Sequence, residues 1–431
     1  MMFCLFYCFM IFCCVHHHMT LKDEESIPPI AIYFNTKGRY EEVNPYLRQD
    51  ILAVNRSSLQ PPSSQCREIY LTAIIRHGTR YPTAKTVRDM QQLHNIVLNN
   101  FPEEQSWLHE ILTQWTMWYN EDMDGRLVQK GVEDLKHLAV RLSKLFPAII
   151  SEEKLRGGLF KFITSSKHRC VNSTLSFKAG LTEMWAITDV EFGHEVNDAL
   201  MRFFDHCTRF VQEVDQNSSA VIEVDKFKQG LEMMRVQKKI AEHLGISSSL
   251  ITYDLAEAAF LLCTYELAVK AVKSPWCLLV DEDDAKVMEY ASDLKEFWKR
   301  GYGHDINSKS SCLLFHDLFS RLEKAVSENT LHQQDAVPLT STNYASQTQR
   351  SFRTSRMLPY AANFLLVLYD CGEEGIRLQP LLNEKPLTFP GLTDQQAFMP
   401  LYEDVRKHYR DLLSGCDFEA ECQLLTNPAE V

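Results

Sequence analysis

The sequence predicts an α/β fold with an all-helical insertion. Residues 68–75 (EIYLTAII) form a short, apolar, β-branched run typical of a buried strand, and residues 84–99 then take a helical pattern. A second strand, loop and helix are predicted from residues 159–164 onward through Gly180. Residues 197–301 have helical periodicity and few glycines, which indicates a separate helical part.

The chain is expected to divide into three parts along its 431 residues. A leader would occupy residues 1–18, an α/β domain residues 34–195 together with 305–431, and the helical insertion residues 196–304. Further apolar strands of the α/β domain are predicted at 363–369 and 376–382.

The net charge and the first residues of the chain limit the classes of protein to which it can belong. The net charge of -12 and the pI near 5.7 argue against a nucleic-acid-binding protein, whose footprint is a basic stripe. Residues 1–15 form an apolar run that suits a signal-peptide core and is too short to span a bilayer. We therefore expect the secretory pathway, with no membrane span after removal of the leader. The last residues are no endoplasmic reticulum retrieval signal, so the lumen and secretion both stay open.

Cysteine usage also favours an oxidising compartment. Thirteen cysteines, four of them in the expected leader, occur without a CxxC pair, so metal-ligand spacing is absent. Cys416 and Cys422 lie close together and would suit a local disulfide, and the odd remainder leaves at least one thiol unpaired. In a secreted chain, the sequons at Asn55, Asn172 and Asn217 are candidate glycan sites. Asn172 lies three residues after Arg169 on the same face of a predicted helix, where a glycan would crowd a phosphate pocket, so we expect this sequon to be unused.

The strongest chemical signal is the loop at residues 76–82 (RHGTRYP), which follows the first predicted strand. Arg76 and Arg80 flank His77, and guanidinium groups bind phosphate oxygens in bidentate fashion. Gly78 allows the backbone to approach a ligand closely. The same cations disfavour the imidazolium form, which keeps His77 neutral and nucleophilic. The pattern predicts phosphate chemistry.

This loop resembles the hallmark of the histidine acid phosphatases, Arg-His-Gly-x-Arg-x-Pro directly after the first core strand. The extended match, RHGTRYPT, occurs with four further segments that are similar to the inositol polyphosphate phosphatase branch of that family: SSKHRC at 165–170, MRFFDHC at 201–207, SPWC at 274–277 and FWKRGYG at 297–303. The resemblance covers the chain from about Phe34 to near its C-terminus. It implies a phosphoglycerate-mutase-like core and no metal or organic cofactor.

The resemblance also implies roles for individual residues. His77 would become phosphorylated, and Arg76 and Arg80 would hold the transferred phosphoryl group. Arg169, in the second strand unit, would complete the clamp. Thr83 and Lys167 are further candidates for contact with the substrate.

The family mechanism also needs a proton donor for the leaving alcohol, which a late His-Ala-Glu or His-Asp motif supplies. This chain has no His-Ala-Glu sequence. Where the donor strand should lie, residues 327–337 read SENTLHQQDAV, which is too polar for a buried strand. One core strand and the donor loop are therefore predicted to be missing. General acid catalysis is worth about 10²–10⁴-fold in rate, so this loss should cripple turnover.

Two dipeptides resemble the donor superficially. His316 and Asp317 lie in a stretch with helical spacing that continues past them, so we expect a pair on a helix and not a donor after a strand. His194 and Glu195 lie at the start of the helical insertion, where the family pattern places no catalytic residue.

Two functions follow from these observations. The first is a phosphomonoesterase that removes phosphate from inositol polyphosphates, namely inositol hexakisphosphate, its lower forms and also 2,3-bisphosphoglycerate, through a phosphohistidine. The alternative is an inositol phosphate binder that retains the arginine clamp and has lost hydrolysis with the donor. A metal-dependent phosphatase is disfavoured because no His, Asp and Glu cluster has ligand spacing.

Overall fold

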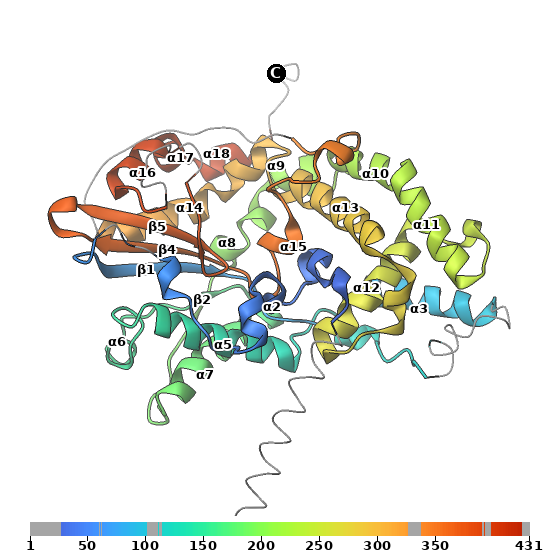
Figure 1. Cartoon of the computed structure of the whole chain (residues 1–431). Coiled ribbons are helices and arrows are strands. Elements are labelled where there is room, and N and C mark those ends of the chain that lie inside the picture. Colours follow the sequence, from blue (N-terminus) through green and yellow to red (C-terminus); the bar gives the residue numbers. More distant parts are fainter. Residues whose placement is uncertain are drawn as a thin grey trace, which may run out of the picture.

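The computed structural model describes residues 27–424 except for positions 60, 62, 101–110, 112–113, 326–337, 390–391 and 393–397. A sheet-containing half lies beside a helical half (Figure 1). The expected leader and the segment where the donor strand should lie fall outside the described residues.

The main sheet has the order β1-β4-β5-β6. Its strands are β1 (Arg67–Ile75), β4 (Asn363–Asp370), β5 (Ile376–Leu382) and β6 (Lys385–Pro386), and every neighbouring pair is antiparallel. Strands β1, β4 and β5 are the apolar runs predicted from the sequence, and each begins or ends within one residue of its predicted bounds. β1 pairs with β4 alone, so it is an edge strand among the described residues.

Helices cover both faces of this sheet (Figure 1). On one face lie α5 (Gln129–Leu145) and α7 (His168–Met184), whose Leu135, Leu142 and Leu181 share a core with Leu365 and Val367 of β4. On the other face lie α14 (Asp305–Ala325) and α16 (Tyr402–His408), which pack on the remaining side chains of β4 and β5. Successive side chains of each strand point to opposite faces of the sheet, so the strands contribute to two separate cores.

The second predicted strand is much shorter than expected. Only β2 (Ile163–Thr164) of the expected run 159–164 is a strand, and it pairs in parallel with β3 (Glu195–Val196) in a separate small sheet. A strand exists only where a neighbour receives its backbone hydrogen bonds, and β3 offers two residues. No described residue joins β2 to β1.

Lys167 occupies the N-cap position of α7, and no side chain caps the helix. Ser166 instead donates through its backbone N and its Oγ to the carboxylate of Asp198, at 2.8 and 2.5 Å. Asp198 therefore holds the loop that precedes α7.

The helical half contains α10 (Ile222–Lys228), α11 (Leu231–Leu244), α12 (Tyr253–Lys270) and α13 (Glu282–Arg300). Its apolar core also includes α3 (Ala84–Asn99), which follows the loop at 76–82, and the short helix η1 (Pro29–Tyr33). The smaller helices of the described chain include η2 (Asn35–Lys37), α2 (Tyr40–Val43), α6 (Glu152–Arg156), α8 (Asp198–Met201), α9 (Thr208–Phe210), α15 (Thr354–Met357), α17 (Arg410–Ser414) and α18 (Phe418–Cys422).

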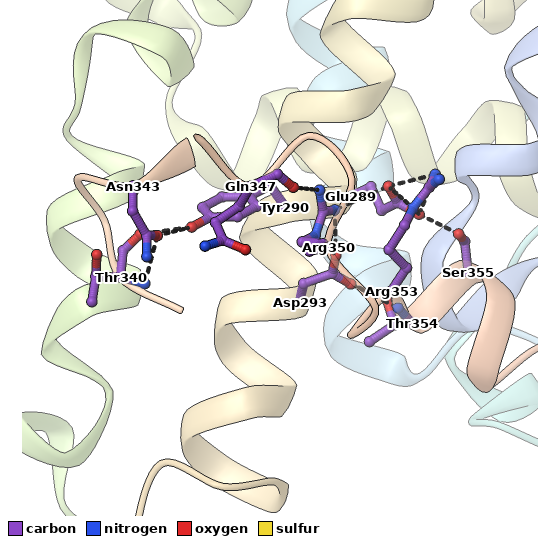
Figure 2. A network of polar contacts seen from close by, with 10 residues as sticks. All are labelled: Glu289, Tyr290, Asp293, Thr340, Asn343, Gln347, Arg350, Arg353, Thr354 and Ser355. Atoms are coloured by element: carbon purple, nitrogen blue, oxygen red, sulfur yellow. Dashed lines mark hydrogen bonds and ion pairs between the residues drawn. The ribbon is translucent and has the colours of Figure 1, made fainter. Parts of the chain in front are cut away.

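A buried ion network joins α13 to the segment after position 337 (Figure 2). Arg350 pairs with Glu289 at 3.0 Å and more closely with Asp293, and Arg353 pairs with Glu289 at 2.9 Å. The Asp293 carboxylate also accepts from the backbone N of Thr354 at 2.8 Å. Both arginine side chains are at most 9% exposed, so these charges are matched inside the protein.

Four disulfides join cysteines of the described residues, and the pairing of Cys416 with Cys422 predicted from the sequence is wrong. Cys416 bonds to Cys312 and Cys422 to Cys207, because α18 carries Cys422 into a small apolar cluster beside Cys207. The other bonds are Cys66–Cys371 and Cys263–Cys277. Cys170 is a free thiol, in agreement with the odd number of cysteines.

No helix in the described part of the chain has both the length and the apolar character needed to cross a membrane.

Candidate active site

The loop at residues 76–82 sits tightly on the start of α5. A Cβ atom on Gly78 would lie 2.2 Å from the carbonyl oxygen of Gly131, and one on Gly131 would lie 2.1 Å from that of Thr79. The backbone N of Gly78 donates to Ser173 Oγ on α7 at 3.1 Å. Glycine at both positions is therefore required for the loop to pack against the helix.

Polar contacts fix the remainder of the loop. Thr79 donates from its backbone N and its Oγ1 to one oxygen of Asp134, at 2.9 and 2.6 Å. Lys130 pairs with the other oxygen of that buried carboxylate. The backbone of Thr79 to Tyr81 also pairs with residues 126–128, through bonds of 2.9 and 3.1 Å. The loop is rigid before any ligand binds.

His77 is held in one tautomer. Its Nδ1 lies 2.8 Å from the carbonyl oxygen of Gly78, which can only accept, so Nδ1 carries the proton and Nε2 keeps its lone pair. Burial, and then the charges of Arg76, Arg80 and Arg169, lower the pKa of His77 to about 2. The arginines lower the pKa of His77 as the sequence predicts, although burial lowers it more.

Arg76 is anchored by the segment around it. Its Nη1 donates to the carbonyl oxygens of Thr36, Leu358 and Pro359, at 2.8, 2.6 and 3.1 Å. Its guanidinium also stacks on the ring of Tyr360 at 5.1 Å. Burial lowers the pKa of Arg76 to about 10, so it stays charged at neutral pH. Only part of its donor set is used, which leaves the rest for a ligand.

Arg80 and Arg169 come together at Gly125, although they lie 89 positions apart in the sequence. A Cβ on Gly125, whose φ is +65°, would lie 3.4 Å from Nη1 of Arg80 and 3.7 Å from Nη1 of Arg169. Burial and the charge of Arg80 lower the pKa of Arg169. The loop after β1 and the first turn of α7 therefore bring both guanidinium groups to one place.

No carboxylate of the described residues forms an ion pair with Arg76, Arg80 or Arg169, the clamp arginines. The Nε atoms of Arg80 and Arg169 are buried and lack a hydrogen-bond partner in the part of the chain that the structure describes. Asp124 lies near Arg80 and Arg169 without an ion pair to either, and three clustered cations with so little counter-charge are unfavourable unless an anion completes the site. The arrangement is suited to a phosphate group facing Nε2 of His77.

Comparison with known proteins agrees with this geometry. The profile of the histidine phosphatase superfamily (branch 2) matches residues 69–345. The chain is 42% identical to multiple inositol polyphosphate phosphatase 1 of Homo sapiens over 92% of its own length and 89% of that protein, and 42% identical to the Gallus gallus protein of the same name over 91% and 92%.

This chain belongs to the histidine phosphatase superfamily. Solved structures share its fold at low identity. A Bifidobacterium longum multiple inositol polyphosphate phosphatase in complex with phosphate aligns with a TM-score of 0.66 at 12% identity, covering 93% of this chain and all of that one. The D. castellii phytase aligns with a TM-score of 0.64 at 14% identity, covering 83% and 82%.

The two remaining sequence candidates lie differently in this histidine phosphatase. Thr83 is the residue before α3, and its Oγ1 lies 3.0 Å from Oγ1 of Thr86. Lys167 is exposed just before α7, and no described residue pairs with it. Neither side chain contacts the clamp arginines through a hydrogen bond or ion pair among the described residues, so any contact with a substrate stays a prediction.

The donor-like dipeptides take the places expected of structural residues. His316 is exposed on α14, and Asp317 pairs within that helix with Arg321 at 2.7 Å. Glu195 pairs with Lys161 at 2.9 Å in the small sheet. Their carboxylates are thus engaged away from the loop of His77.

Sequence reasoning missed several neighbours of the site. Lys37 lies beside Arg76 and Arg80, and burial followed by these two charges lowers its pKa to about 7. Tyr360 packs near His77, with ring centroids 6.1 Å apart, and Tyr265 of α12 lies beside Arg80. The basic segment Lys37-Gly38-Arg39 was the one available signal, and it is weak without the fold.

Within the described residues, no group of three or more His, Cys, Asp and Glu side chains could hold a metal ion.

Proposed function

We propose that this chain is a phosphomonoesterase that removes phosphate from inositol polyphosphates through a phosphohistidine on Nε2 of His77. The observation that carries the proposal is the neutral imidazole, fixed by Gly78 with its lone pair free, among three arginines that form no ion pair with a described carboxylate. The two relatives at 42% identity, both multiple inositol polyphosphate phosphatases, support inositol polyphosphates as the substrate class.

The chemistry follows from these residues. The clamp arginines bind the oxygens of one phosphate group and stabilise the charge that these oxygens carry in the transition state. Nε2 attacks phosphorus in line with the leaving ring oxygen, and water then releases phosphate from His77. Because the pKa of His77 is low, the nucleophile is unprotonated even in acid, which suits an acid phosphatase.

The four disulfides support folding in an oxidising compartment. We infer that the protein acts in the secretory pathway, in the endoplasmic reticulum lumen or after secretion.

Phosphate release from inositol hexakisphosphate by the purified protein, beside His77→Ala, tests the proposal. Release should require His77, and acid-labile phosphate should be trapped on the wild-type protein alone. His316→Ala is the matched control, because it removes an exposed histidine far from the loop in sequence. Equal release by wild type and His77→Ala would contradict the proposal.

The absence of His-Ala-Glu favours a second function, binding without hydrolysis. Calorimetric binding of inositol hexakisphosphate to both proteins separates the two functions. Tight binding by wild type with no release and no phosphohistidine would identify a receptor.

A further inference from the structure

We propose that Lys37 takes the place of the missing donor and gives its ammonium proton to the leaving alcohol. This inference rests on the proposed function, because it needs His77 as the nucleophile. It concerns a residue from η2, ahead of the first core strand, whereas the family donor follows a late strand.

The first support is position. Arg76 Nη1 donates to the carbonyl oxygen of Thr36, the residue before Lys37, at 2.8 Å. On the other side, Gly38 accepts through its carbonyl from the backbone N of Tyr360 at 3.0 Å, and the next residue, Ala361, donates to the carbonyl of His77 at 3.1 Å. Hydrogen bonds on both sides of Lys37 therefore lead to the catalytic loop.

The second support is the state of the side chain. Lys37 Nζ donates to Thr36 Oγ1 at 2.6 Å and has no ion pair among the described residues. The groups that face it are Arg76 and Arg80 from the loop and Lys295 and Glu296 from α13. Three of these four are cations, and burial adds to them, so its pKa falls to about 7. A lysine tuned this way is an effective general acid near neutral pH.

The third support is elimination among the described residues. Asp317 and Glu195 are paired elsewhere. Asp124 lies near Arg80 and Arg169, and its Oδ1 accepts from the backbone N of Ala84 at 3.0 Å, where it holds the start of α3. Lys37 carries a transferable proton. This proton is needed neither for an ion pair like those of Asp317 and Glu195 nor for holding the start of a helix, as Asp124 does.

The proposed step balances. Nε2 of His77 forms a bond to phosphorus while the bond from phosphorus to the ring oxygen breaks, and that oxygen takes a proton from Nζ of Lys37. The products are an alcohol, a neutral amine and phosphohistidine. Water then attacks phosphorus and loses a proton to the amine, the P–N bond returns its electron pair to Nε2, and Lys37 is an ammonium group again.

Two variants and two substrates test this role. Lys37→Met removes charge and proton, whereas Lys37→Arg keeps the charge but cannot release a proton. Inositol hexakisphosphate has an alcohol leaving group, which needs the proton. p-Nitrophenyl phosphate releases a stable anion, and this leaving group does not need the proton. Both variants should lower kcat for inositol hexakisphosphate by about 10²–10⁴-fold and leave kcat for the aryl ester nearly unchanged.

Lys295→Met is the matched control, because it removes a neighbouring exposed lysine of α13. It should leave the ratio of the two kcat values unchanged. For wild type, kcat/KM on inositol hexakisphosphate should fall above about pH 7, as the ammonium form with a pKa of about 7 is lost. That basic limb should be absent for the aryl ester and for Lys37→Arg.

Three results would overturn the inference. Full turnover by Lys37→Arg would mean that charge alone matters, and an equal loss on both substrates would mean a role in binding. Wild-type protein that hydrolyses the aryl ester through His77 but not inositol hexakisphosphate would show that no group delivers the proton. Failure of the proposed function is distinct, since then neither substrate would give a phosphohistidine.

Discussion

Two arginine clusters in this molecule use the same side chain in opposite ways. Arg350 and Arg353 lie in the helical half, where Glu289 and Asp293 match their charges (Figure 2). Arg76, Arg80 and Arg169 surround His77 with no ion pair to any carboxylate in the described residues. Matched cations hold the fold together, whereas unmatched cations are available for an anionic ligand.

The largest expected effect separates the clusters by stability. Arg350→Met leaves the buried carboxylate of Asp293 without its ion-pair partner and leaves Arg353 as the only partner of Glu289, so the free energy of unfolding should fall by about 3–5 kcal/mol. Arg80→Met removes one of several like charges and should cause no such loss. Urea unfolding of both variants, followed by circular dichroism, measures the difference. A comparable loss in both would show that the clamp is a structural cluster as well.

The second expected effect is catalytic. Arg80→Met should lower kcat/KM for phosphate release by about 10²–10³-fold, the usual cost of removing one donor to a developing anion. Arg353→Lys, which keeps a cation beside Glu289, should retain activity in the folded fraction. Steady-state phosphate release checks both. Near-normal activity of Arg80→Met would remove this arginine from the clamp.

The third expected effect is ligand stabilisation. An anion that binds the folded state at 100 times its Kd should add about 2.7 kcal/mol of stability. Inositol hexakisphosphate, or inorganic phosphate at higher concentration, should therefore raise the melting temperature of wild type much more than that of Arg80→Met. A shift of equal size in both proteins would place the bound anion elsewhere.

The smallest expected effect follows from the protonation of His77. Its pKa in the folded state, about 2, lies below the ordinary value of 6.5 in the unfolded chain. The unfolded chain alone binds this proton between those values, so stability is present above pH 6.5 and is lost as the pH falls. From pH 7 to 5 the loss should be about 2 kcal/mol larger for wild type than for His77→Asn. Equal losses in urea unfolding would refute the shift.

The local sequence pattern was sufficient to predict the elements that the chain forms from contiguous residues. The predicted helix at 84–99 and the strands that became β4 and β5 all occur, because their apolar periodicity directly reflects the buried faces. The loop of His77 could also be found, because its composition is specific. These features need no knowledge of distant partners.

Features that depend on distant partners were missed or wrong. The run 159–164 reads as a strand, but only Ile163 and Thr164 find a neighbour for their backbone. Cys416 pairs with Cys312 across 104 positions, a choice that spacing alone cannot reveal. Lys37 joins the site through a hydrogen bond between Arg76 and Thr36, 40 positions apart. Each depends on tertiary placement.

The disulfide between Cys66 and Cys371 joins the residue before β1 to the residue after β4. At the opposite end of this ladder, the backbone N of Arg76 donates to the carbonyl of Ala362 at 2.8 Å. A slip of one residue between the two strands would displace His77 by about 3.3 Å and turn every side chain of β1 to the wrong face. The covalent link opposes such a slip together with the backbone ladder, and it thereby helps to set the position of His77 at the other end of β1.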